Sequence, residues 1–237
     1  MIQGLLFDYG GTIDTNGIHW GEVLWQSYQK LGLAVEKPLF TLAYNFGERS
    51  LAINPLVKPE HNFYDILALK VEQQFNFLKE NGVDLDRSHI LTIAEGCNAF
   101  AQENVNLAKP MLVALQAKYP LVMVSNFYGN LRTVLTEFGI IDLFDEVVES
   151  AVVGVRKPDA AIYQLGVDAL GFPAEDCVVI GDSYAKDIVP AKQTGCKAVW
   201  LNKQGWDDDK SKSEEPEYTA DVMINDFSQL REAIEGL

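Results

Sequence analysis

The sequence predicts an α/β protein with a doubly wound parallel sheet and an inserted all-helical module. Two observations carry this prediction. From about residue 107 onward, short runs rich in β-branched residues alternate with helical patterns, which is typical of βαβ units and a parallel sheet. Between about residues 16 and 100, helical patterns follow one another and no convincing strand interrupts them.

The first strand is predicted by the apolar run Leu5-Leu6-Phe7, which delivers Asp8 into the glycine pair Gly10-Gly11. A hydrophobic run of this length indicates a buried strand, and the carboxyl end of such a strand is where an open α/β sheet binds ligands. The two glycines allow a sharp backbone turn beside Asp8. Taken alone, the pattern fits an ordinary strand-end aspartate equally well.

The remaining strands and the helices between them are predicted in the second half of the chain. The expected strands are Leu121–Val124, Glu146–Val148, Cys177–Ile180, Lys197–Leu201 and Val222–Ile224. The expected helices are Met111–Tyr119, Leu131–Phe138, Asp159–Leu170, Tyr184–Thr194 and Phe227–Ile234. Gly139 and Gly171 are the expected stops of two of these helices. The charged segment Asp207–Glu217 predicts a solvated surface loop.

The inserted module is predicted to contain four helices, Gly21–Leu31, Leu39–Phe46, Phe63–Glu80 and His89–Gln102. Because the module interrupts the chain after the first strand, its two ends must lie close together at the carboxyl edge of the sheet, above Asp8. Trp20, Trp25 and Tyr28 recur at helical spacing, which indicates packing in the interior of this module.

Composition excludes several classes of function. The 237 residues are 48% hydrophobic and 22% charged, as in an ordinary globular protein. A net charge of −15 argues against non-specific binding to nucleic acid or anionic membranes, so an anionic ligand needs a local cation or a metal. No run approaches the roughly 18 apolar residues of a membrane span, and the first residues do not predict a signal peptide. We expect a cytoplasmic monomer or homodimer whose cysteines Cys97, Cys177 and Cys196 are reduced.

Polar residues follow several of the predicted strands. They are Ser125, Asn126, Lys157, Asp182 and Asp187. Singly, each has a mundane explanation as a helix cap, a solvated lysine or an acidic first turn of a helix. Because a parallel sheet brings the carboxyl ends of its strands to one edge, the sequence predicts that these residues gather around Asp8.

The acidic members of this set suit a magnesium ion and a nucleophile. Asp8 and Asp182 offer hard oxygen ligands of the kind that Mg²⁺ prefers together with waters and substrate phosphate. Asp187 would either orient metal-bound water or ligate directly. One oxygen of Asp8 is then left to attack phosphorus and form an aspartyl-phosphate.

The other members suit a transferring phosphoryl group, which carries negative charge on its equatorial oxygens. The Ser125 hydroxyl, the Lys157 ammonium and the backbone amides near Gly10 and Gly11 can stabilise that charge in a site with little water. The sequence therefore predicts phosphoryl transfer at this edge of the sheet.

Four ordered segments resemble the motifs of the haloacid dehalogenase-like hydrolase superfamily. They are Asp8-Tyr9-Gly10-Gly11-Thr12-Ile13, Ser125-Asn126, Lys157-Pro158, and Gly181-Asp182-Ser183 followed by Asp187. Their order and spacing are similar to those of the superfamily over almost the whole chain, and the helical module resembles its helical cap. Each motif is weak alone, whereas the ordered set is highly specific.

The resemblance implies a Rossmann-like core domain at 1–15 and 105–237, a cap domain at 16–104, and Mg²⁺-dependent phosphatase activity on a small phosphorylated metabolite. Asp8 is implied as the nucleophile, and Asp8 and Lys157 as the catalytic residues. The implied substrate-binding residues are Gly10, Gly11, Thr12, Ser125, Asn126 and Lys157. The implied metal ligands are Asp8, Gly10, Asp182 and Asp187.

Gly10 departs from the superfamily pattern, which resembles Asp-x-Asp-Gly-Thr. The second aspartate protonates the leaving alcohol and then activates water, and loss of such an acid/base costs about 10² to 10⁴ in rate. Three interpretations stay open. The first is a weak or specialised phosphatase whose substrates have good leaving groups, such as aryl or acyl phosphates. The second is a different reaction such as carbon–phosphorus bond cleavage, and the third is a non-catalytic protein that binds a phosphorylated ligand or a protein partner. We favour the phosphatase.

Asp14 and His19 are the nearest candidates for the missing acid. Each also has a structural explanation, Asp14 at the hinge of the cap and His19 as a solvated or helix-capping residue. Carbon–phosphorus cleavage would need a cap lysine that forms an imine, for which Lys30, Lys37 and Lys58 are available.

Overall fold

A computed structural model describes residues 1–203 and 217–237, and in it one parallel sheet holds six strands in the order β3-β2-β1-β4-β5-β6. The strands are β1 (Gly4–Phe7), β2 (Leu121–Ser125), β3 (Glu146–Glu149), β4 (Cys177–Gly181), β5 (Lys197–Leu201) and β6 (Val222–Ile224). The central strand β1 pairs with β2 on one side and β4 on the other, so the winding direction reverses at β1. This reversal point is where open α/β sheets place their ligands.

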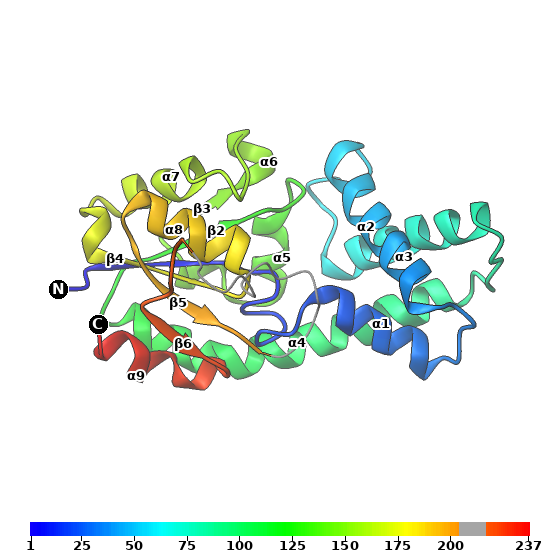
Figure 1. Ribbon diagram of the computed structural model, residues 1–237, viewed down its shortest axis with the longest axis horizontal. Coiled ribbons are helices and arrows are strands. Elements are labelled where there is room, and N and C mark those ends of the chain that lie inside the picture. The colour runs from blue at the N-terminus through cyan, green and yellow to red at the C-terminus, as the bar shows by residue number, and fades with distance from the viewer. Residues whose placement is uncertain (204–216) are drawn as a thin grey trace.

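Helices cover both faces of the sheet, which confirms the predicted doubly wound α/β core (Figure 1). Alternate strand residues point to opposite faces: Leu5 and Phe7 pack towards one, Leu6 towards the other. The first face is covered by α4 (His89–Gln116), α5 (Leu131–Glu137) and α9 (Leu230–Glu235). The second is covered by α7 (Ala161–Leu170) and α8 (Val189–Thr194). Short helical segments complete the core: α6 (Ser150–Val153), η1 (Ile141–Leu143), η2 (Ala174–Asp176), η3 (Tyr184–Ile188) and η5 (Phe227–Gln229).

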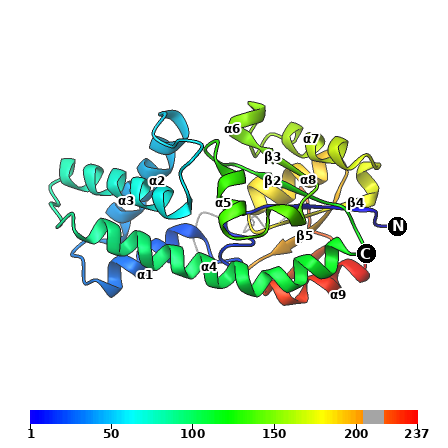
Figure 2. The same ribbon diagram turned by 180° about the vertical axis from the view of Figure 1, so that it is seen from behind.

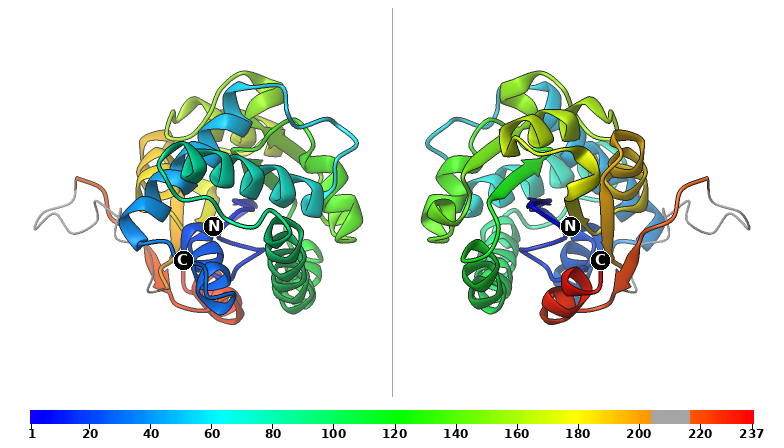
Figure 3. Two further views of the ribbon diagram at one scale, coloured as in Figure 1. Left: turned by 90° about the vertical axis from the view of Figure 1, so that its right-hand side faces the viewer. Right: turned by 90° about the vertical axis from the view of Figure 1, so that its left-hand side faces the viewer.

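The inserted module consists of α1 (Trp20–Lys30), α2 (Lys37–Ile53), α3 (Phe63–Glu80) and the first part of α4. It lies beside the core at the end opposite the two chain termini (Figure 1 and Figure 3). Helix α3 begins at a capping box between Asn62 and Asp65, and it packs against both α2 and α4. We call this helical module the cap.

The interior of the cap is aromatic and continues into the core. The Tyr28 ring packs against Phe40 at a centroid distance of 4.8 Å, as its helical spacing predicts. Phe63 contacts Trp20 at 5.4 Å within the cap and Tyr9 at 6.1 Å in the first loop of the core. One hydrophobic cluster therefore connects the cap to the sheet face covered by α4.

Helix α4 differs from the prediction. The sequence predicted two helices, His89–Gln102 and Met111–Tyr119, whereas the structure has a single helix of 28 residues that runs from the cap along the core (Figure 2). A proline inside a helical pattern normally ends or kinks the helix, and Pro110 lies inside α4. Buried residues continue at helical spacing across this position, namely Val105, Ala108 and Leu112, and packing keeps the helix continuous.

Smaller differences concern other helix boundaries. Helix α2 extends well beyond the predicted Leu39–Phe46, and the predicted helix Tyr184–Thr194 divides into the π-helical turn η3 and α8. The predicted surface loop Asp207–Glu217 lies outside the described residues except for Glu217. Among the residues that the structure describes, no helix is both long enough and apolar enough to cross a membrane.

Candidate active site

The loop after β1 carries the first motif. Asp8 continues the strand, since its backbone N–H donates to the Ile180 carbonyl of β4 at 2.9 Å, and it is only 6% exposed. Gly11 then adopts a left-handed conformation with φ of 97°, and a β-carbon at this position would lie 2.4 Å from the Asp182 carboxylate. Glycine is therefore required at Gly11 both by conformation and by close approach to Asp182.

Gly10 differs from its neighbour Gly11. It is exposed, its φ lies outside the left-handed region, and a β-carbon there would meet no atom within 4 Å. The backbone at Gly10 thus has room for a side chain. The absent acid/base is a feature of the sequence and is not imposed by the local fold.

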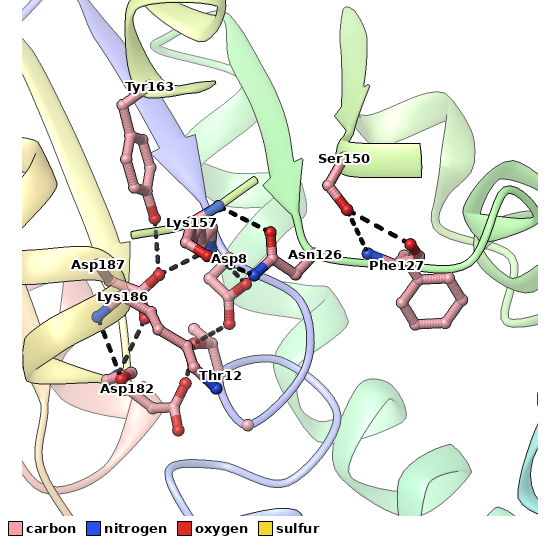
Figure 4. Close-up of polar contacts among 12 residues, drawn as sticks. Asp8, Thr12, Asn126, Phe127, Ser150, Lys157, Tyr163, Asp182, Lys186 and Asp187 are labelled. Carbon is pink, nitrogen blue, oxygen red and sulfur yellow. Dashed lines mark hydrogen bonds and ion pairs between the residues drawn. The ribbon is translucent and has the colours of Figure 1, made fainter. Parts of the chain in front are cut away.

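Lys157 joins two carboxylates from different strand ends (Figure 4). Its ammonium is buried and lies 2.6 Å from Asp8 Oδ1 and 2.7 Å from Asp187 Oδ1. The Tyr163 hydroxyl donates to the same Asp187 oxygen at 2.7 Å, and the Lys157 ammonium lies 5.2 Å from the Tyr163 ring centroid. These contacts fix Lys157 against the candidate nucleophile.

The loop after β2 holds the backbone of Lys157. The Asn126 side chain donates to the Lys157 carbonyl at 3.0 Å and accepts from the Lys157 N–H at 2.9 Å. Ser125, the last residue of β2, is 2% exposed at the same sheet edge. Asn126, predicted to bind substrate, is thus engaged through both ends of its amide with the segment that carries the lysine.

The second Asp8 oxygen faces a different group of residues. Thr12 Oγ1 lies 3.1 Å from Asp8 Oδ2 and 3.3 Å from Asp182 Oδ1, and so bridges the two carboxylates. Asp182 directly follows β4, and oxygen atoms of Asp8, Asp182 and Asp187 all lie within 4.8 Å of one another. The three predicted acidic residues are therefore brought together (Figure 4).

Asp187 is already well supplied with donors. Besides Lys157 and Tyr163 on Oδ1, the Ser183 N–H donates to its Oδ2 at 2.9 Å. Asp187 therefore suits a supporting position, orienting Lys157 and the loop that carries Asp182. Asp8 and Asp182 retain more acceptor capacity for a ligand.

The charges of this cluster do not balance. Burial raises the pKa of Asp8 to about 6, an increase that Lys157 opposes and Asp187 reinforces. Burial, together with Asp8 and Asp187, raises the pKa of Asp182 well above its usual range. For Lys157, burial works to lower the pKa, but Asp187 and Asp8 outweigh it and the pKa is raised. One lysine thus faces three carboxylates, and a divalent cation with hard oxygen ligands fits this donor set.

Asp14 links the first loop to the cap. Its Oδ1 accepts from the Gly11 N–H at 2.7 Å, and its Oδ2 accepts from Trp20 Nε1 at 2.9 Å. Burial raises its pKa to about 7 although both hydrogen bonds oppose this shift. Because both oxygens hold structural donors, the geometry agrees with the hinge interpretation of Asp14.

The other cap candidates either have a structural role or lie on the surface. His19 caps helix α1 by accepting from the Gly21 N–H at 3.0 Å, as the structural interpretation predicted. The three lysines considered for an imine, Lys30, Lys37 and Lys58, are all exposed.

Sequence reasoning missed two buried participants. Tyr163 lies on the buried face of α7, and its apolar neighbours made it look like an ordinary core residue. Lys70 is 7% exposed in α3 and pairs with Glu48 of α2 at 2.5 Å. A lysine between the buried Leu67 and Val71 was the available signal, because an unpaired lysine is rarely placed on the apolar face of a helix.

Comparison with known proteins shows which family the chain resembles. The family model described as haloacid dehalogenase-like hydrolase matches residues 2–195. The chain is 34% identical over 103 residues to a glyceraldehyde 3-phosphate phosphatase from Methanocaldococcus jannaschii, covering 44% of this chain and 43% of that protein. It is 26% identical to the pyrimidine 5′-nucleotidase YjjG of Escherichia coli, covering 85% of this chain and 77% of that protein.

Among solved structures, the chain resembles the HAD-hydrolase YfnB from Bacillus subtilis, crystallised with magnesium. The TM-score is 0.60 at 18% identity, over 98% of each chain. At this identity the likeness establishes the fold, in agreement with the sheet order described above. The alignments with the first curated relatives span less than half of those proteins, 43%, 34% and 42% of their length.

Proposed function

The chain belongs to the haloacid dehalogenase-like hydrolase family, and we propose that it is a Mg²⁺-dependent phosphatase that acts on a small phosphorylated metabolite through an aspartyl-phosphate at Asp8. The observation that carries the proposal is the placement of Asp8 at the reversal point of the sheet. There one of its oxygens faces Lys157 and the other faces Thr12 and Asp182. The phosphatase names of the relatives support the same reaction class.

The proposed magnesium ligands are the carboxylates of Asp8 and Asp182 and the backbone carbonyl of Gly10, with Asp187 in support. The excess negative charge of this cluster and the exposed position of Gly10 support the assignment. Bound Mg²⁺ would reduce the repulsion between the negative charges of the phosphoryl group and of the carboxylates.

The proposed reaction proceeds by two displacements at phosphorus. A carboxylate oxygen of Asp8 forms a bond to phosphorus while the bond to the ester oxygen breaks, and the leaving oxygen takes its proton from water. Water then attacks the phosphorus of the aspartyl-phosphate, which releases phosphate and restores the Asp8 carboxylate. Lys157, Ser125 and the amides of the first loop stabilise the negative charge of the phosphoryl oxygens in both steps.

The absence of a carboxyl at Gly10 favours esters whose leaving group departs without an acid. Aryl and acyl phosphates meet this condition, and they are the substrates on which we expect the highest rates. The carbon–phosphorus alternative finds no support in the cap lysines. Lys30, Lys37 and Lys58 are exposed, and Lys70 forms an ion pair with Glu48, which opposes the neutral amine that an imine requires.

The test is hydrolysis of 4-nitrophenyl phosphate and acetyl phosphate with Mg²⁺ by the wild type and by Asp8→Asn. We expect Asp8→Asn to lose at least about 10³-fold in kcat, because the nucleophile is removed. Asp168→Asn, which changes an exposed aspartate of α7, is the matched control and should leave the rate unchanged. Full activity in Asp8→Asn would overturn the mechanism. A wild type that binds phosphate but turns over neither substrate would favour the non-catalytic binding protein.

A further inference from the structure

Glu48 lies where the cap meets the core. It belongs to α2, and its Oε2 accepts from the Tyr128 hydroxyl at 2.7 Å. Tyr128 is in the core loop that begins with Asn126. The other oxygen, Oε1, lies 2.5 Å from the ammonium of Lys70 on α3, which also lies 5.7 Å from the Tyr128 ring centroid. A carboxylate of the cap is thus held from both sides, by a buried lysine and by the loop after β2.

This part of α2 faces the candidate active site. Tyr44 lies one helical turn before Glu48, on the same face of the helix, and its hydroxyl is hydrogen-bonded to Glu48. Burial raises the pKa of Tyr44 well above its usual range, and the charges of Glu48 and Asp182 add to the effect. Lys186, next to Asp187, lies close enough to act on Glu48. Tyr44 and Glu48 therefore lie close enough to the loop that carries Asp182 and Asp187 to interact with its charges.

The surroundings of Glu48 keep it ionised. Burial works to raise its pKa, but Lys70 and Tyr128 bring the pKa below its usual range. Its side chain is nevertheless 33% exposed, whereas that of Lys70 is 8% exposed. The Glu48 carboxylate is therefore more accessible to a ligand than the Lys70 ammonium is. An ionised carboxylate has about four acceptor positions, and the three donors Lys70, Tyr128 and Tyr44 leave one of them available.

We propose that Glu48 is a specificity-determining residue, which selects phosphate esters whose leaving group carries a hydroxyl or an ammonium and rejects those that carry a carboxylate. The inference rests on the proposed phosphatase function and names a substrate class for it. Lys70 has a distinct part in this arrangement, because its ammonium balances the charge of Glu48.

Three esters of similar size provide the probes: 2-hydroxyethyl phosphate, 2-aminoethyl phosphate and carboxymethyl phosphate. The readout is the ratio of kcat/KM between 2-aminoethyl and carboxymethyl phosphate. In Glu48→Gln, which keeps the shape of the side chain, we expect this ratio to fall about 10- to 100-fold, as for loss of one hydrogen bond to a charged group. Glu48→Asp, which keeps the charge, should retain part of the preference.

Glu72→Gln is the matched control, because Glu72 is also a glutamate of the cap but pairs with Arg87 on the exposed surface. Its ratio should equal that of the wild type. A purely structural role for Glu48 would lower kcat/KM equally for all three esters and leave the ratio unchanged, which would overturn the proposal.

The outcome is separable from that of the proposed function. If the wild type hydrolyses no phosphate ester, the phosphatase proposal fails, and the same three esters are titrated calorimetrically into the Asp8→Asn chain with and without Glu48→Gln. A preference for 2-aminoethyl over carboxymethyl phosphate that disappears with Glu48→Gln upholds the role of Glu48 in binding. Equal affinities, or no binding of any ester, overturn it.

Discussion

The two sides of the Asp8 carboxylate differ in how completely they are filled. On the Oδ1 side, Lys157, Asp187 and Tyr163 are buried, and Asp187 accepts hydrogen bonds from both Lys157 and Tyr163, so these polar groups find their partners within the protein. On the Oδ2 side, Thr12 bridges to a half-buried Asp182, and Gly10 leaves open space. The fold itself completes the first side, whereas the second side is complementary to a ligand.

The largest effect is expected from placing a side chain on the Oδ2 side of Asp8. Gly10→Asp introduces the carboxyl that the superfamily pattern has there, at a position where a β-carbon meets no atom within 4 Å. We expect kcat on alkyl phosphates, whose leaving groups need a proton, to rise about 10²- to 10⁴-fold. Steady-state kinetics on an alkyl and an aryl phosphate measure the effect.

Gly10→Asn is the control for this gain, because it occupies the same space without an acid. A comparable gain in Gly10→Asn would show that proton transfer is not what the wild type lacks. No gain of kcat in Gly10→Asp would mean that the space beside Gly10 has a function other than helping the leaving group to depart.

Removing Lys157 disrupts the hydrogen-bonded cluster on the Oδ1 side of Asp8. Lys157→Met leaves Asp8 and Asp187 without their shared cation, and we expect kcat to fall about 10²- to 10³-fold because phosphoryl charge is no longer stabilised. Loss of one partner of a buried ion pair should also lower the free energy of unfolding by about 3–5 kcal/mol. Kinetics and urea denaturation test the two effects. Lys118→Met, at an exposed pair with Glu235, should change neither.

Magnesium bound on the Oδ2 side of Asp8 should stabilise the folded protein. At a Mg²⁺ concentration about 100 times its Kd, binding adds about 2.7 kcal/mol, which for a chain of this size raises Tm by about 5–10 °C. The cation competes with protons for the carboxylates. Because the pKa of Asp8 is raised to about 6, the increase in Tm should be largest near pH 8 and become smaller as the pH falls through 6. Calorimetric melting measures it. An equal increase in Asp182→Asn would place the ion elsewhere.

The core of the site was predictable because strand ends are easy to find. Short apolar runs locate the strands, and a parallel sheet necessarily brings Asp8, Ser125 and Asp182 to one edge. Asp187 follows from its place in the helical turn after Asp182, and Lys157 from its place in the segment after β3 and α6. Only the structure reveals that Asn126 binds the Lys157 backbone, because an asparagine side chain can bind either a substrate or a neighbouring backbone segment equally well.

The cap was less predictable for a physical reason. Glu48 and Lys70 lie on different helices, and what makes them notable is their contact with each other and with Tyr128, far away in the sequence. Helical periodicity describes which face of a helix is apolar, but it does not specify which helix that face will meet. Tyr163 was hidden in the same way, as an aromatic residue on a buried face.

The continuous helix α4 makes the cap and the core parts of one mechanical element. From His89 to Pro110 it measures roughly 32 Å at 1.5 Å per residue, so a swing of about 5° at the proline would carry the far end through roughly 3 Å. The same helix rests against α9 at the C-terminal end of the chain. A displacement of the cap relative to the core therefore requires α4 to tilt or bend, because this one helix belongs to both.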